Sequence, residues 1–216
     1  MKIKNLGWST FQLSIGDITV LTDPLALKDS GLGLPKSSAD VVLFTDSKFK
    51  EKENIIEEYD LIKKVTPDHR ESIFEISSPG EFEIGGVMIR RDIDDSFYII
   101  DETKLRVVYM GLLDNSFDIN STKNLGDVDV LILPIGNGSL FVDYDKIEKI
   151  LTNLDPSVLL PCAYKKDGLK IGKDIKSRED FIKHFGFTNV KDETYLNMSS
   201  SAPELEQKNM EVIFLN

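Results

Sequence analysis

The chain has 216 residues, of which 41% are hydrophobic, and a formal charge of −11, because 37 aspartates and glutamates outnumber 26 lysines and arginines. A chain of this size folds by default as one domain and buries about 70% of its unfolded surface, so neither a disulfide nor a metal is needed to hold it together. The acidic balance argues against a nucleic-acid or anionic-membrane partner, since both require clustered lysine and arginine, and we expect one domain over residues 1–216.

Short strands are predicted along the first 45 residues. Residues 2–6, 10–15 and 17–21 are rich in β-forming residues, and Gly16 separates the last two runs as in a tight hairpin. Residues 40–45 form a continuous apolar run, which is typical of a strand buried on both faces.

The next part of the chain combines one predicted helix with further strands. The charged stretch 48–64 is predicted as a surface helix because its apolar residues have helical spacing: Ile55, Ile56, Tyr59 and Ile62. Residues 73–77 and 81–90 are predicted as strands, and Gly85 with Gly86 indicates a bulge or a corner within the second.

The second half begins with another predicted hairpin. Residues 96–101 and 105–110 form its two strands, and residues 128–133 form a further strand buried on both faces. Near the end of the chain, residues 198–209 are polar and are predicted as a loop, and residues 210–215 as a terminal strand.

Two helices have clear start signals. Asp143 caps a stretch with apolar residues at helical spacing. Ser177 with Asp180 three residues later resembles a capping box, and Gly186 suits the residue that ends this helix. Many strands with few helices favour a core of sheet packed on sheet, with helices outside.

Cysteine and histidine are scarce. Cys162 is the only cysteine, so no intramolecular disulfide forms and a reducing compartment is expected. The first seven residues lack the apolar core of a secretory signal, and no run approaches the ~18 apolar residues of a membrane span, so we expect a cytoplasmic protein. The two histidines, His69 and His184, are too few for most zinc sites and most imidazole-based triads.

Several short motifs occur in a particular order along the chain: residues 7–11 (GWSTF), 21–24 (LTDP), 31–35 (GLGLP), 39–42 (ADVV), 79–87 (PGEFEIGGV), 126–136 (GDVDVLILPIG) and 160–165 (LPCAYK). In this order they resemble the metallo-β-lactamase-fold hydrolases of the ascorbate-6-phosphate-lactonase-like branch, over essentially the whole chain. The resemblance implies an α/β fold, a four-layer αββα sandwich, with a site at the edges of the sheets. It also leaves assembly into a homo-oligomer open.

The metal-binding positions of that family hold other residues here. In the family's Thr-His-x-His-x-Asp-His stretch, the three histidines align with Asp46, Lys48 and Glu51 and the aspartate aligns with Lys50. The family's metal-bridging aspartate aligns with Leu112, its last histidine with Ala163, and the histidine of its early Gly-His-Ser with Trp8. A protonated lysine has no lone pair and repels a dication, and leucine and alanine offer no ligand atom. We therefore predict a catalytically inactive scaffold, a pseudoenzyme without metal or cofactor, retained for binding a ligand or a protein or for self-assembly.

Two further hypotheses concern charged groups at this cleft. Three carboxylates offer oxygen ligands that Mg²⁺ or Ca²⁺ prefers, which would make the chain a hydrolase with a non-standard site: Asp46, Glu51 and Asp114. The simpler interpretation is that these are solvated charges. If Lys48 and Lys50 enter the former metal cavity, their ammonium groups neutralise a neighbouring carboxylate and lower its pKa, the candidates being Asp46, Glu51 and Asp23.

The remaining distinctive residues are interpreted as structural. Trp8 is predicted to plug the vacated pocket. Cys162 is predicted to be a buried, inert thiol because neither histidine lies near it in the expected fold. His184 falls in the last turn of a helix, where a partial positive charge suits the helix dipole, and His69 falls in a polar turn.

Overall fold

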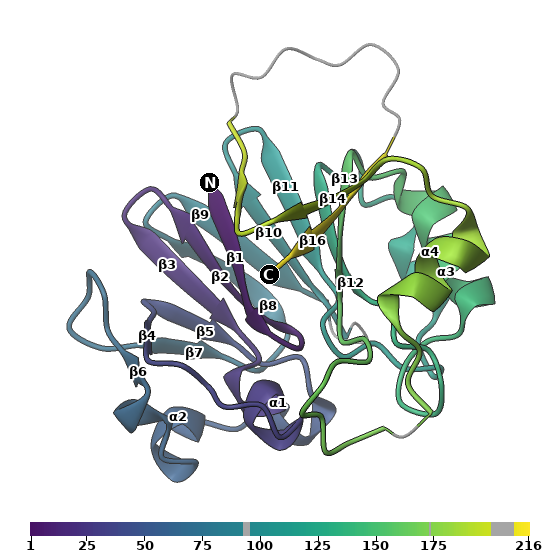
Figure 1. Ribbon diagram of the computed structural model, residues 1–216. Helices are drawn as coiled ribbons and strands as arrows, with labels where there is room; N and C mark the ends of the chain where they lie inside the picture. Colours follow the sequence, from purple (N-terminus) through teal and green to yellow (C-terminus); the bar gives the residue numbers. More distant parts are fainter. Residues whose placement is uncertain (93–95, 173, 200–209) are drawn as a thin grey trace.

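The computed structural model describes residues 1–92, 96–172, 174–199 and 210–216. Two β-sheets lie face to face (Figure 1). The first sheet has the strand order β15 (Leu196–Asn197), β1 (Lys2–Gly7), β2 (Thr10–Ile15), β3 (Ile18–Thr22), β5 (Val41–Leu43) and β7 (Phe74–Ile76). The second has the order β14 (Val190–Glu193), β16 (Glu211–Leu215), β13 (Val158–Cys162), β12 (Val130–Pro134), β11 (Leu105–Tyr109), β10 (Tyr98–Glu102), β9 (Val87–Arg91) and β8 (Gly80–Ile84).

Helices lie outside the two sheets. The helices α3 (Tyr144–Leu154) and α4 (Arg178–Phe185) lie against the second sheet, and α1 (Pro24–Asp29) and α2 (Ile55–Glu58) lie beside the first (Figure 1). The smaller elements are the strand pair β4 (Ser37–Ser38) and β6 (Val65–Thr66) and the 3-10 turns η1 (Ser47–Phe49), η2 (Leu61–Lys63) and η3 (Ile119–Thr122). The predicted sheet-on-sheet core with outer helices is confirmed.

Strand β12 shows how the layers are held together. Val130 and Ile132 pack into the core between the sheets, whereas Leu131 and Leu133 pack into a second core beneath α3 and α4. All four are fully buried because side chains alternate between the two faces of a strand and both faces are covered here. The predicted strand buried on both faces is therefore confirmed.

Both predicted helix starts are confirmed. The Asp143 carboxylate accepts the N–H of Lys146 in the first turn of α3. At α4 the Ser177 hydroxyl and the Asp180 carboxylate form the predicted capping box, and Gly186 ends the helix with φ 67°. Satisfying the free N–H groups of the first turn is the physical reason for these residue types.

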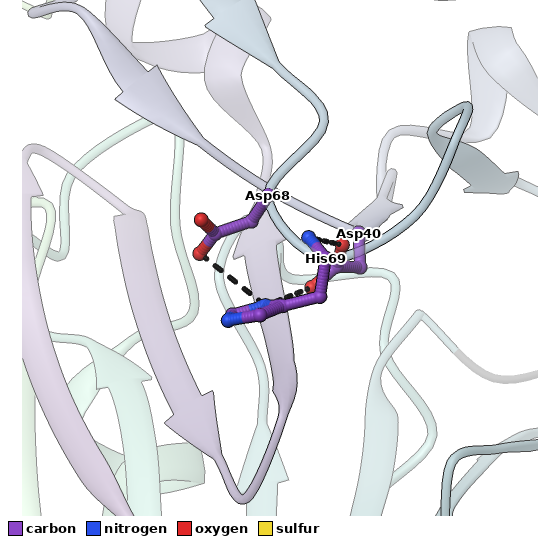
Figure 2. A group of neighbouring side chains, drawn as sticks. All are labelled: Asp40, Asp68 and His69. Carbon is purple, nitrogen blue, oxygen red and sulfur yellow. Dashed lines mark hydrogen bonds and ion pairs between the residues drawn. The ribbon is translucent and has the colours of Figure 1, made fainter.

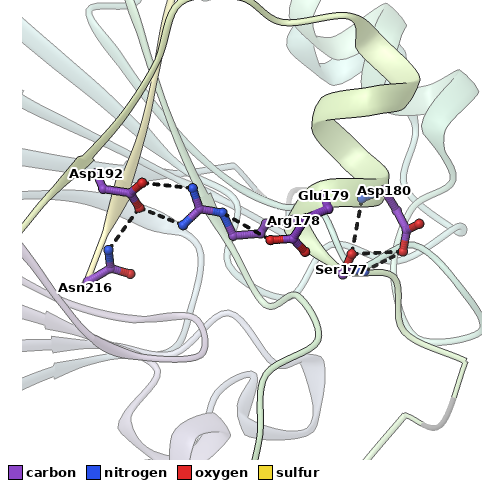
Figure 3. A network of polar contacts seen from close by, with 6 residues as sticks. All are labelled: Ser177, Arg178, Glu179, Asp180, Asp192 and Asn216. Atoms are coloured by element: carbon purple, nitrogen blue, oxygen red, sulfur yellow. Dashed lines mark hydrogen bonds and ion pairs between the residues drawn. The ribbon is translucent and has the colours of Figure 1, made fainter.

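The start of α4 is also tied to the second sheet (Figure 3). Arg178 donates to both carboxylate oxygens of Asp192 in β14, at 2.6 and 3.0 Å, and Asn216 donates to the same carboxylate. The guanidinium also stacks on the ring of Phe214 in β16, at 4.1 Å from its centre. This contact fixes the helix against the two outermost strands of the sheet.

The helix predicted over residues 48–64 is wrong. This stretch consists of η1, α2 and η2, and left-handed backbone at Glu51, Asn54 and Asp60 separates the pieces. Ile62, expected on the buried side, is 54% exposed. The apolar spacing reflects two short turns that each bury their own isoleucine or leucine, and a regular helix cannot continue through a left-handed residue.

Glycines 85 and 86 form a two-residue hairpin turn between β8 and β9, where a bulge or a corner was predicted. Both have positive φ, the geometry that matches the twist of paired strands. Of the predicted loop 198–209, residues 200–209 lie outside the described residues. Strands β13, β14 and β15 were not predicted, and each pairs with a strand that is distant in the sequence. None of the described helices has the length and apolar character needed to cross a membrane.

Candidate functional site

Strand ends that are distant in the sequence frame an open cleft of about 490 Å³ at one edge of the sandwich. Trp8 follows β1, Asp23 follows β3, Asp46 comes three residues after β5, and Leu112 comes three residues after β11. Neighbouring parallel strands end at the same edge of a sheet, which brings the loops after them together. The lining is about equally polar and apolar. Apolar and aromatic side chains such as Leu25, Phe44, Phe49, Leu140, Phe141 and Ile171 lie beside four carboxylates, one ammonium and several hydroxyl groups, the charged residues being Asp23, Asp29, Asp46, Asp114 and Lys48.

Asp23 is buried at the base of the cleft, and its carboxylate accepts three hydrogen bonds. It accepts the Thr45 N–H at 2.8 Å, the Thr45 hydroxyl at 2.6 Å and the Tyr109 hydroxyl at 2.6 Å. Tyr109 also lies 2.8 Å from the carbonyl oxygen of Ser9. The network joins the ends of β3 and β5 in the first sheet to β11 in the second, and so holds the two sheets together across the core.

Burial raises the pKa of Asp23 above its ordinary value and outweighs the opposing effect of the hydrogen bonds from Thr45 and Tyr109. Burial likewise raises the pKa of the Tyr109 hydroxyl, and the neighbouring Asp23 raises it further. The hypothesis that a lysine lowers the pKa of Asp23 is wrong, since desolvation dominates at this depth.

Lys48 lies in the cleft and bridges two carboxylates. Its ammonium nitrogen is 3.0 Å from Asp46 and 3.5 Å from Asp29, and the side chain is half exposed. Burial lowers the pKa of Lys48, but the hydrogen bond to Asp46 and the charges of both carboxylates outweigh it and raise that pKa overall. Asp46 also accepts the backbone N–H of Lys48 as the cap of η1. The ammonium therefore lies in the cleft between two of its carboxylates.

The other charged candidates do not join this group. Lys50 and Glu51 are exposed and do not line the cleft, and Glu51 instead borders a separate hollow next to Phe74. The left-handed backbone at Glu51, with φ 65°, ends η1 and changes the direction of the chain. Asp114 lines the cleft, but its carboxylate accepts the N–H and the hydroxyl of Ser116. Within the described residues, the carboxylates of Asp46, Glu51 and Asp114 do not form a three-ligand group.

The apolar candidates form one wall of the cleft and the buried layer behind that wall. Trp8 is 3% exposed, lines the cleft, and packs on Phe141 with ring centres 5.6 Å apart. The Trp8 carbonyl accepts the N–H of Ala163, which is buried behind this wall and does not line the cleft. Leu112 lines the cleft directly. Cys162 is buried, and burial raises the pKa of its thiol, as expected for an inert cysteine.

The structure places a different set of candidate ligands at the opposite end of the first sheet (Figure 2). Asp40, Asp68 and His69 bring two carboxylates and an imidazole together, and no other such group of three occurs in the part of the chain that the structure describes. The sequence analysis placed His69 in a polar turn and did not link it to Asp40. The only sequence signal was the adjacent Asp68-His69 pair, because Asp40 is distant along the chain.

Comparison with known proteins identifies relatives of this fold. Residues 2–163 match the family model described as "Beta-lactamase superfamily domain". A proposed Zn-dependent hydrolase of the metallo-beta-lactamase superfamily from Thermotoga maritima has 21% identity and a TM-score of 0.74, with 100% of both chains covered. A metallo hydrolase from Ignicoccus hospitalis has 15% identity and a TM-score of 0.58, over 85% of this chain and 89% of that one. No curated protein matches the chain in sequence.

Proposed function

Because this chain belongs to the beta-lactamase superfamily, we propose that it is a catalytically inactive member of the lactonase-like branch, with no metal in its cleft, that binds a small ligand there. Residues 1–216 form one domain in this proposal, and the protein works in the cytoplasm. The observation that carries it is the ion pair of Lys48 with Asp46 in the cleft, at 3.0 Å, between two residues that the resemblance aligns with metal ligands.

The chemistry of the cleft lining supports the absence of a hydrolytic zinc. Such an ion takes imidazole, thiolate or carboxylate ligands and leaves one position for water. Among the described residues, the cleft is lined by no histidine and no cysteine. Its carboxylates are engaged, Asp23 by Thr45 and Tyr109 and Asp46 by Lys48. The ammonium would repel a dication at close range, so this donor set does not suit zinc.

The open volume supports binding of a small molecule. Ligand pockets range over roughly 300–1,000 Å³, and the cleft of about 490 Å³ has a volume within that range. Trp8 and Phe141 offer aromatic surface, while Lys48 between Asp29 and Asp46 offers both signs of charge. A self-assembly role has no comparable support among the described contacts.

Trp8 makes a direct binding assay available, because it is the only tryptophan of the chain and it lines the cleft. We expect members of a panel of small metabolites to change its fluorescence in a saturable way. Leu112→Arg fills the cleft and is expected to abolish the change. Ile62→Arg, at an exposed position away from the cleft, is the matched control and is expected to leave it intact.

The alternative, a hydrolase with a hard cation in the cleft, is tested by activity and metal content. We expect no hydrolysis of lactones or phosphate esters when Mg²⁺, Mn²⁺ or Zn²⁺ is added. Metal analysis of the purified chain is run beside Asp46→Asn. Turnover, or a stoichiometric metal that Asp46→Asn removes, would contradict the proposal.

A further inference from the structure

The cluster of Asp40, Asp68 and His69 lies at the end of the first sheet opposite the cleft. Asp40 immediately precedes β5, whereas the cleft residues Thr45 and Asp46 follow that strand. Asp68 and His69 belong to the turn between β6 and β7. The cluster is thus separate from the cleft, and none of its three residues lines the cleft.

The three side chains converge on one point. In Figure 2 the carboxylates of Asp40 and Asp68 both turn toward the Nδ1 atom of His69. That nitrogen is 3.2 Å from Asp40 Oδ2 and 3.6 Å from Asp68 Oδ2, and all three candidate ligand atoms lie within 4.8 Å of one another. Zinc bonds of about 2.0–2.2 Å to nitrogen and oxygen place the ligand atoms of a tetrahedral site about 3.3–3.6 Å apart. The two separations from Nδ1, 3.2 and 3.6 Å, lie close to that spacing, and the third, between the two carboxylate oxygens, is within 4.8 Å.

A second set of donors holds the candidate ligands in place. The backbone N–H of Thr19 donates to Asp40 Oδ2 at 2.9 Å, and the Thr19 hydroxyl donates to Asp68 Oδ2 at 2.8 Å. The backbone N–H of His69 donates to the other oxygen of Asp40, at 2.6 Å. Each candidate ligand oxygen therefore keeps a lone pair beyond the one that faces Thr19. Hydrogen bonds of this kind orient the ligands in known metal sites.

Charge and access also suit a cation. The Asp40 side chain is fully buried, while the side chains of Asp68 and His69 are 34% and 48% exposed. Two carboxylates with a neutral imidazole carry a charge that a divalent ion balances. The exposed side admits the ion from solvent and leaves room for a water as fourth ligand.

We propose that Asp40, Asp68 and His69 form a binding site for a divalent transition-metal ion, with Zn²⁺ the best match, that fastens the turn between β6 and β7 to β3 and β5. The ligand set of two oxygens and one imidazole nitrogen, rather than oxygens alone, distinguishes it from a Mg²⁺ or Ca²⁺ site. Without the ion, Nδ1 lies at hydrogen-bond distance from Asp40. When the ion binds, it takes the lone pair of Nδ1 and releases any proton held there to solvent.

The test is a calorimetric titration of the full-length, metal-free chain with Zn²⁺ near neutral pH. We expect one equivalent to bind. His69→Ala removes one ligand and Asp68→Asn weakens another, and each is expected to lower the affinity by at least about tenfold, the loss typical even of outer-shell changes. His184→Ala removes the only other histidine and is the matched control, with unchanged affinity expected. Circular dichroism of each variant checks that the fold is intact.

Two results would overturn the site. One is the absence of saturable Zn²⁺ binding by the unaltered chain, which leaves the proposed cleft function intact. The other is binding that His69→Ala leaves unchanged. If Asp46→Asn removes that binding instead, the ion lies in the cleft, and the proposal that the cleft holds no metal is wrong as well.

Discussion

The buried carboxylate of Asp23 provides the sharpest test of how the cleft is built. Asp23→Ala leaves the N–H and the hydroxyl of Thr45 without their acceptor, whereas Tyr109 keeps the Ser9 carbonyl at 2.8 Å. A buried donor without a partner costs about 1–3 kcal/mol, so two of them cost about 2–6 kcal/mol. That loss is a large share of the ~5–15 kcal/mol that stabilises a typical domain.

Asp23→Asn is expected to cost less, about 1–3 kcal/mol, because only the Thr45 hydroxyl loses its acceptor. The amide oxygen still accepts the Thr45 N–H, and the amide nitrogen donates to the Tyr109 oxygen, which in turn donates to Ser9. Asparagine also tolerates the left-handed backbone of this position, where φ is 41°, better than alanine does. Asp29→Ala, at the exposed rim of the cleft, is the control, with a change within about 0.5 kcal/mol expected.

Urea unfolding followed by circular dichroism measures these differences, and its pH dependence has a defined sign. Because the pKa of Asp23 is raised in the folded state, its contribution is present below the unfolded pKa and is lost as the pH rises through the folded pKa. As the pH rises from the unfolded pKa of Asp23 to its folded pKa, the unaltered chain should therefore lose stability relative to Asp23→Asn. If Asn destabilises as much as Ala, the anion itself is required and the structural role assigned to Asp23 is wrong.

Two further predictions concern packing and capping. Gly111→Ala would place a Cβ against the Tyr109 hydroxyl, so we expect a loss of about 1–3 kcal/mol in the free energy of urea unfolding. Gly33→Ala is the control and should be nearly neutral, because outside its chain neighbours no atom lies within 4 Å of the added Cβ. Equal effects of the two substitutions would contradict the packing argument. Ser177→Ala removes the cap of α4 and should cost about 1 kcal/mol in thermal unfolding, and an unchanged midpoint would show that the contact of Arg178 with Asp192 holds the helix start without it.

Local signals in the sequence were sufficient wherever the structure depends on neighbouring residues. The caps at Asp143 and Ser177, the buried strand β12 and the hairpin from β10 to β11 all follow from residues a few positions apart. The segment 48–64 shows the limit, because its apolar spacing is that of a helix while left-handed backbone at Asn54 and Asp60 divides it. The apolar spacing correctly predicted burial of Ile55 and Ile56 but not of Ile62, because periodicity does not report where the backbone turns.

By itself the sequence determined the alternation of strands and helices and the types of residue available for chemistry, including the scarcity of histidine and cysteine. Only the tertiary structure decided which of those residues meet. It paired Lys48 with Asp46 and Asp29, carried Glu51 away from them, and brought Asp40 to His69 across 29 positions of the chain. The physical reason is that a ligand set or an ion pair depends on distances of a few ångströms in space, and strand order and loop direction, rather than spacing along the chain, determine those distances.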